Sequence, residues 1–124
     1  MWNRSLRCTT LCAALSLAIA PAPTAYGDGA NDDAKARALK KFEEGERAFA
    51  EKRYKDAIDL FLAADSLVKS PAFAYNAGLA YEAMGDVAAA LKWSRDYLRR
   101  APQATDRADV DGRIARYEAS LTAK

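Results

Sequence analysis

The sequence predicts an all-α fold, a short α-solenoid of about five helices arranged as antiparallel helix-turn-helix repeats. Three observations lead to this fold class. Apolar residues recur every three or four positions in five successive segments, which is the period of an amphipathic helix. No stretch alternates apolar and polar residues as a half-buried strand does. Finally, two parts of the chain share one pattern at a fixed offset, which indicates an internal repeat.

The first 27 residues follow the order of regions found in a secretory signal. A short basic start carries Arg4 and Arg7, and an apolar run follows over residues 11–20. This run is too short to cross a bilayer, which needs about twenty residues. We therefore expect a cleavable signal, cut after Gly27 or Ala25, and a periplasmic or secreted chain without a stable membrane anchor.

Removal of this signal changes the chemistry available to the chain. Both cysteines, Cys8 and Cys12, leave with two arginines, so that 17 basic residues face 17 acidic ones. A neutral domain lacks the positive charge of nucleic-acid-binding proteins, so we expect no nucleic-acid partner. The whole chain contains no histidine, which with the loss of the cysteines removes imidazole bases, thiolate nucleophiles and nearly all zinc arrangements. We expect no enzyme activity, no metal and no cofactor.

The first helix is expected to begin at Asn31, whose side chain could cap it, and residues 28–37 are expected to form a flexible N-terminus and the start of this helix. Lys52 and Arg53 interrupt the apolar stripe. The stripe itself consists of Ala34, Ala38, Phe42, Gly45 and Phe49, and Leu39 widens it.

The second helix is expected to begin near Tyr54 and to end before the Lys69–Pro71 turn, where Ser70 is a candidate cap and proline takes the first position of the third helix. The third helix should end at the Gly85–Asp86 turn. The second helix buries Ala57, Ile58, Phe61, Ala64 and Leu67, and the third carries Phe73, Ala77, Leu79, Ala80, Tyr81 and Met84.

The fourth helix is expected from Val87 and should stop before Pro102. A fifth should start at Thr105 or Asp106. Its apolar stripe consists of Val110, Ile114, Tyr117 and Leu121. Short turns between these segments make antiparallel neighbours the expected arrangement.

The internal repeat superposes Gly45 on Gly78, and Ala57 on Ala90. This pattern resembles the tetratricopeptide repeat, whose unit of about 34 residues is a pair of antiparallel helices. The most specific match is "AYNAGLAYEAMGD", residues 74–86. The resemblance implies an exported bacterial protein with two repeats over 38–102 and a C-terminal capping helix over 103–124. The repeat positions are Gly45, Tyr54, Ala57, Phe61, Gly78, Tyr81, Gly85, Ala90 and Pro102.

The two repeat glycines are expected where the paired helices touch. A side chain at Gly45 or Gly78 would push the helix axes beyond their usual separation of about 8–10 Å. Three positions depart from the family's pattern: Ala74 replaces the common tryptophan, Lys52 replaces a turn glycine, and Tyr97 occupies a site usually held by alanine.

The resemblance implies a concave groove, lined by the first helix of each unit, that holds a peptide or a partner's helix. Aromatic anchors beside a few polar groups suit such a ligand. With only two units, Phe49 and Tyr75 are equally consistent with core positions. Capture of a C-terminal carboxylate is not expected, because only Asn76 matches the family's clamp. The groove candidates are Phe42, Glu46, Phe49, Tyr75, Asn76, Leu79 and Glu82.

These expectations favour a non-enzymatic protein–protein interaction module, an adaptor or scaffold of the bacterial cell envelope. The alternative is a structural component that self-associates into a homo-oligomer. The sequence does not identify the protein or peptide partner.

Overall fold

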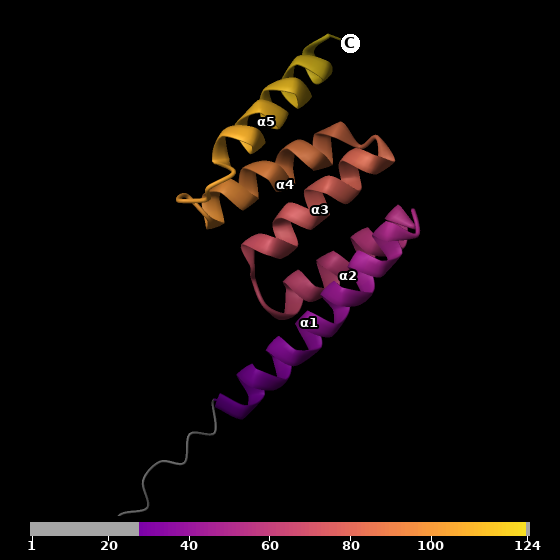
Figure 1. Ribbon diagram of the computed structural model, residues 1–124, viewed down its shortest axis with the longest axis vertical. Coiled ribbons are helices and arrows are strands. Elements are labelled where there is room, and N and C mark those ends of the chain that lie inside the picture. Colours follow the sequence, from indigo (N-terminus) through magenta and orange to yellow (C-terminus); the bar gives the residue numbers. More distant parts are fainter. Residues whose placement is uncertain (1–27, 124) are drawn as a thin grey trace, which may run out of the picture.

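The computed structural model describes residues 28–123, which form five α-helices and contain no strand. Figure 1 shows the helices stacked in chain order along the long axis, with the first and last at opposite ends. Each helix packs against the next one in the chain. This arrangement confirms the predicted all-α solenoid. The helices are α1 (Asp28–Ala50), α2 (Tyr54–Leu67), α3 (Pro71–Met84), α4 (Val87–Arg100) and α5 (Arg107–Thr122).

The predicted signal over 1–27 lies outside the described residues. Among the residues that are described, no helix combines the length and the apolar character needed to cross a membrane.

The start of α1 differs from the prediction. The helix begins at Asp28, so Asn31 lies inside it and the prediction of an N-cap there is wrong. Residues 28–37, expected to be partly flexible, are helical throughout. Ion pairs one turn apart support this stretch, from Asp32 to Lys35 and from Asp33 to Arg37.

The ends of α3 follow the predicted turn chemistry. Ser70 occupies the N-cap position and Pro71 the first helical position, although the serine side chain makes no capping hydrogen bond. Gly85 ends the helix with φ of 81°, in the left-handed region that glycine adopts without a steric penalty. Asp86 then caps α4, because its carboxylate accepts a hydrogen bond of 3.0 Å from the Ala89 N–H.

The turn between α1 and α2 contains a residue in a costly conformation. Lys52, which stands where the repeat pattern has glycine, adopts φ of 61°. A residue with a Cβ pays roughly 1–2 kcal/mol in this region. The Arg53 N–H donates to the Ala48 carbonyl at 2.8 Å and closes the turn.

Tyr97 fills the space between α3 and the start of α5. Its ring lies edge-on to Tyr75 at 5.1 Å between centroids, and its hydroxyl donates to the Asp106 carboxylate at 2.7 Å. This hydrogen bond, followed by burial, raises the pKa of Tyr97 to about 12. The helix α5 begins at Arg107, one residue after the later of the two predicted starts, and Asp106 occupies the N-cap position. Its carboxylate accepts the hydrogen bond from Tyr97 and makes no capping bond.

The core lies along the contacts between successive helices. One cluster joins α1, α2 and α3 around Phe61, and another joins α4 and α5 around Tyr117. Tyr81 packs against both clusters. The predicted repeat alanines, Ala57 and Ala90, are fully buried in them.

A buried ion pair ties the two repeats together, and sequence patterns gave no sign of it. The Asp65 carboxylate on α2 is 2% exposed. The Arg100 guanidinium at the end of α4 holds both of its oxygens, at 2.5 Å and 3.1 Å, and also donates to the Ser70 carbonyl. Asp96 pairs with the same guanidinium, and Lys69 with the same carboxylate.

The paired helices approach each other more closely at Gly45 than at Gly78. A Cβ on Gly45 would lie 2.6 Å from a ring carbon of Phe61 and 3.3 Å from the Leu60 Cβ, so α2 excludes a side chain there. A Cβ on Gly78 would lie no closer than 3.4 Å, from the Ser94 Oγ, which is ordinary contact. The prediction that a side chain would separate the helices therefore fits Gly45 and is wrong for Gly78.

We expect Gly45→Ala to lower the free energy of unfolding by up to about 2 kcal/mol. Overpacking against Phe61 costs roughly 1–3 kcal/mol and exceeds the gain in helix propensity of about 1 kcal/mol. Gly78→Ala is the matched variant and should raise the free energy of unfolding by up to about 1 kcal/mol, because only the propensity gain applies. Urea denaturation of both variants measures the difference. Equal effects of the two alanines would contradict it.

Candidate partner-binding face

The groove predicted from the sequence corresponds to one side of α1 and α3, which we call the inner face and define by Leu39, Glu46, Asn76 and Leu79. Gly45 and Gly78 point at α2 and α4. The next residue along each helix, Glu46 or Leu79, is turned by about 100° from that direction. Leu39 and Glu46 are exposed there, and Asn76 and Leu79 are partly exposed, so α2 and α4 leave this side at least partly uncovered.

Phe42 and Phe49 contribute to the core. The Phe42 ring packs between those of Phe61, at 5.7 Å, and Phe73, at 5.2 Å. The Phe49 ring lies edge-on to Tyr54 at 5.3 Å and packs on the cluster that joins α1, α2 and α3. Both are half-buried, so each can present only part of its ring to a partner.

Tyr75 joins α3 to α5. Its hydroxyl accepts a hydrogen bond of 2.8 Å from Arg113, whose guanidinium also lies 5.2 Å from the ring centroid. Burial lowers the pKa of Arg113, but the hydrogen bond to Tyr75 and the charge interactions with Tyr75 and nearby groups raise it by more. The pKa of Arg113 therefore lies above its ordinary value. The ring also packs against Tyr97. Tyr75 is thus held by α5, and its role as a partner contact stays a prediction.

The other predicted groove residues are more accessible. Glu46 and Glu82 are exposed, and Leu79 is half-buried. The Asn76 amide donates to the Ala72 carbonyl at 2.9 Å, so its carboxamide oxygen remains available as an acceptor. No ion pair joins either glutamate to another residue in 28–123, as judged from the ion pairs found there.

Glu82 also affects a buried hydroxyl on α5. Tyr117 is 5% exposed, and its hydroxyl makes no hydrogen bond within residues 28–123. Burial and then the nearby Glu82 carboxylate raise the pKa of Tyr117 to about 12. The hydroxyl therefore stays protonated at physiological pH, beside the Glu82 carboxylate.

A pocket that sequence reasoning missed lies at the N-terminal end of this face. Its volume is about 410 Å³, and we call it the Leu39 pocket. Leu39 is 54% exposed, more than any other large hydrophobic residue in the described chain. Its spacing of two helical turns from Glu46 is the signal that could have placed it on the inner face. The pocket is lined by Lys35, Ala38, Leu39, Val68, Lys69, Ser70, Pro71 and Phe73.

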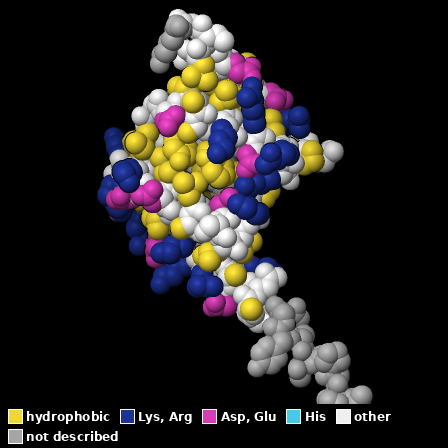
Figure 2. Space-filling model, turned by 180° about the vertical axis from the view of Figure 1, so that it is seen from behind, with side chains coloured by type: hydrophobic (Ala, Val, Ile, Leu, Met, Phe, Trp, Pro, Cys, Tyr) yellow, Lys and Arg dark blue, Asp and Glu magenta, His cyan; other side chains and the backbone are white. Residues whose placement is uncertain are grey.

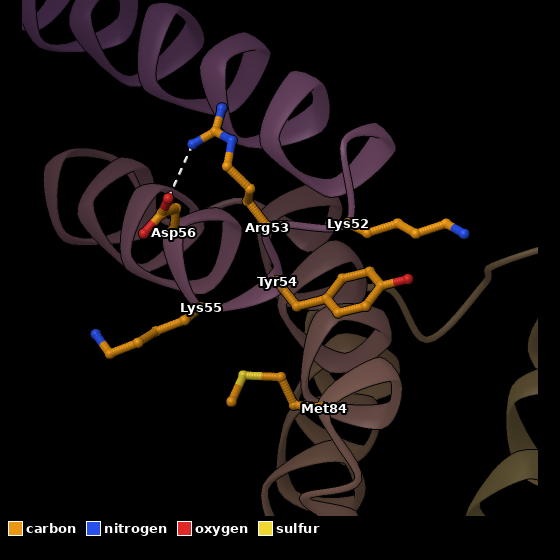
Figure 3. Close-up of a pocket in the computed structure, with 6 residues that line it drawn as sticks. All are labelled: Lys52, Arg53, Tyr54, Lys55, Asp56 and Met84. Atoms are coloured by element: carbon orange, nitrogen blue, oxygen red, sulfur yellow. Dashed lines mark hydrogen bonds and ion pairs between the residues drawn. The ribbon is translucent and has the colours of Figure 1, made fainter.

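A second hollow, of about 360 Å³, lies at the turn between α1 and α2 beside Met84. Figure 3 shows Arg53 directed at Asp56, while Lys52 and Lys55 extend away on opposite sides. The guanidinium is bound by Asp56 at 2.8 Å and by Glu51 at 2.7 Å. Its charge is therefore already balanced, and the hollow offers no converging set of polar groups.

A third hollow lies along α4 beside Trp93, and its cations are also largely paired. Arg99 pairs with Asp96, and Arg95 with Glu118. Figure 2 shows side chains of both charges around a hydrophobic centre on the face seen from behind.

Within residues 28–123 no group of three or more potential ligands is arranged to hold a metal ion.

No protein-family model, no curated protein and no solved structure matches the chain. The candidate site therefore depends on the geometry of the inner face.

Proposed function

We propose that the chain is a non-enzymatic adaptor or scaffold of the bacterial cell envelope that binds a peptide or partner helix on its inner face. The observation that carries this proposal is the uncovered side of α1 and α3. Leu39 and Glu46 on α1, with Leu79 and Asn76 on α3, combine exposed apolar surface with polar groups that have bonding capacity left. Extended and helical peptides bind to surfaces of this kind.

The envelope location follows from the predicted signal over 1–27, and the repeat architecture supports an adaptor, because helical repeats present extended surfaces to partners. Secretion of the full chain from a bacterial host, followed by N-terminal sequencing of the processed product, tests the location. A start at Asp28 or Tyr26 is expected.

Affinity capture from envelope extract tests the binding face. We expect the double variant Glu46→Arg, Leu79→Asp to lose partners that the native chain retains. Leu121→Asp, at an exposed apolar position on α5, is the control and should retain them. Recovery of the same proteins by all three chains would overturn the assignment of the inner face.

Self-association is the second candidate function, because exposed apolar side chains such as Leu39 also suit a contact between copies. Sedimentation velocity over a wide concentration range distinguishes the two. A monomer supports the adaptor, whereas a dimer that Leu39→Asp disrupts supports self-association. Leu39 is a better probe than Phe42, because a charge at Phe42 would disturb the core.

A further inference from the structure

The Leu39 pocket has the form of a site for one apolar side chain. Its volume of about 410 Å³ falls within the range of about 300–1,000 Å³ that is common for ligand sites. Leu39 and Ala38 on α1, Val68 after α2, and Pro71 and Phe73 on α3 supply an apolar lining. Three segments thus border an open hollow whose mainly apolar lining suits an aliphatic or aromatic side chain.

Two ammonium groups border this apolar lining. The Lys69 side chain is 73% exposed and lies 3.1 Å from the Asp65 carboxylate. Arg100 also holds both oxygens of that carboxylate, and the Lys69 ammonium lies largely in solvent, so Lys69 can contact a further anion without leaving Asp65 unpaired. Lys35 is 58% exposed and has only a distant partner, Asp32, at 3.8 Å. Both lysines can therefore bind an external anionic group.

The charge changes sign further along the inner face. Glu43 follows Leu39 by one turn, and Glu46 follows by two. A negative group of the ligand is therefore favoured on the side of Lys35 and Lys69, and disfavoured towards the middle of α1. The surface therefore favours a negatively charged ligand, and the change of sign fixes the direction in which that ligand lies.

We propose that the Leu39 pocket anchors the partner peptide by binding an apolar side chain whose neighbouring residue is aspartate or glutamate. This inference rests on the proposed function and names the chemistry of its ligand. The apolar side chain fills the hollow, and the adjacent carboxylate pairs with Lys35 and Lys69. Desolvated apolar anchors supply most of the affinity at such sites, and the charges supply specificity.

Selection of random dodecapeptides displayed on phage, with the full chain as the target, tests the proposal. We expect enrichment of peptides with Leu, Ile or Phe next to Asp or Glu. Fluorescence anisotropy of an enriched synthetic peptide should show binding weakened about tenfold or more by Leu39→Ser. The double variant Lys35→Gln, Lys69→Gln should weaken it severalfold and reduce its dependence on salt.

Two matched controls separate these effects from general ones. Leu121→Ser removes an exposed leucine from α5, and Lys55→Gln removes a lysine paired with Asp59 at the same 3.1 Å found for Lys69. Both should leave peptide binding unchanged. Circular dichroism of each variant checks that the helices are intact.

The outcomes distinguish this inference from the proposed function. Enriched peptides without an acidic residue, or peptides sensitive to Leu79→Asp but not to Leu39→Ser, would overturn the inference and leave the proposed function standing. Failure to enrich any peptide would count against both. A dimer of the full chain that dissociates in Leu39→Ser would show that a second copy occupies the pocket, and would also overturn the inference.

Discussion

Phe61→Ala should lower the free energy of unfolding by about 3–5 kcal/mol, the cost of removing a large aromatic side chain from a packed core. Phe61 is 1% exposed and contacts Phe42 on α1, and its ring closes against the backbone of Gly45. The loss would be a large share of the roughly 5–15 kcal/mol that stabilises a typical domain. Urea denaturation followed by circular dichroism measures this loss of stability. If the alanine variant does not fold, Phe61→Leu is measured in its place.

Phe49→Ala is the control for this variant, because Phe49 is also aromatic but half-buried. Its cost should be clearly smaller. A double-mutant cycle then tests the contact itself: Gly45→Ala should lose its penalty in the Phe61→Ala background, where the new Cβ meets a cavity. A cost for Phe61→Ala no greater than that for Phe49→Ala would show that Phe61 is not central to the core.

Arg100→Met should lower the free energy of unfolding at neutral pH by about 3–5 kcal/mol, because it leaves the buried Asp65 carboxylate without its main partner. Lys69 would remain beside that carboxylate, but it is largely exposed and is bound through only one carboxylate oxygen. Arg99→Met is the control. Arg99 is 80% exposed, and its pairing with Asp96 is worth about 0–1 kcal/mol.

The pH dependence of the stability difference distinguishes the effect of the lost charge interaction from the effect of lost packing. Burial raises the pKa of Asp65, but hydrogen bonds and charge interactions with Arg100 and Lys69 outweigh burial and hold the pKa below its ordinary value. The unfolded chain therefore binds a proton more readily, and the stabilisation from Asp65 is lost as pH falls through and below about 4. The difference between native chain and Arg100→Met should shrink between pH 7 and pH 3. A difference independent of pH would contradict the role of the carboxylate.

The predicted and observed helix ends agree most closely at the turn between α3 and α4. Gly85 and Asp86 were predicted as a turn, and the structure places one in a left-handed C-cap and the other in an N-cap. These motifs are local, so neighbouring residues suffice to predict them. The start of α1 was missed because Asn31 is only one of several polar residues that can lie within a helix supported by ion pairs.

The candidate site was predicted less well than the fold. An apolar or aromatic residue on a helix can face a core, a neighbouring helix or solvent, and periodicity alone does not distinguish these. The sequence leaves Tyr75 equally consistent with a partner contact and a core position, and the structure adds its contact with Arg113, which is distant in sequence. Leu39 widens the apolar stripe in the sequence, but its side chain is more than half exposed. The site depends on how α5 packs against α3 and how the turn after α2 packs against α1. Patterns of neighbouring residues do not predict these contacts.

The sequence by itself determined the all-α class, the number of helices and the turns between them, because helical period and capping chemistry act over a few residues. Only the tertiary structure decided which glycine admits no side chain, which carboxylate is buried and which apolar residues remain uncovered. Gly45 and Gly78 occupy the same repeat position, but Phe61 stands opposite the first and Ser94 opposite the second. The two glycines therefore differ because of side chains on a neighbouring helix. Contacts between helices depend on how the whole chain packs, not on the residues next to each glycine.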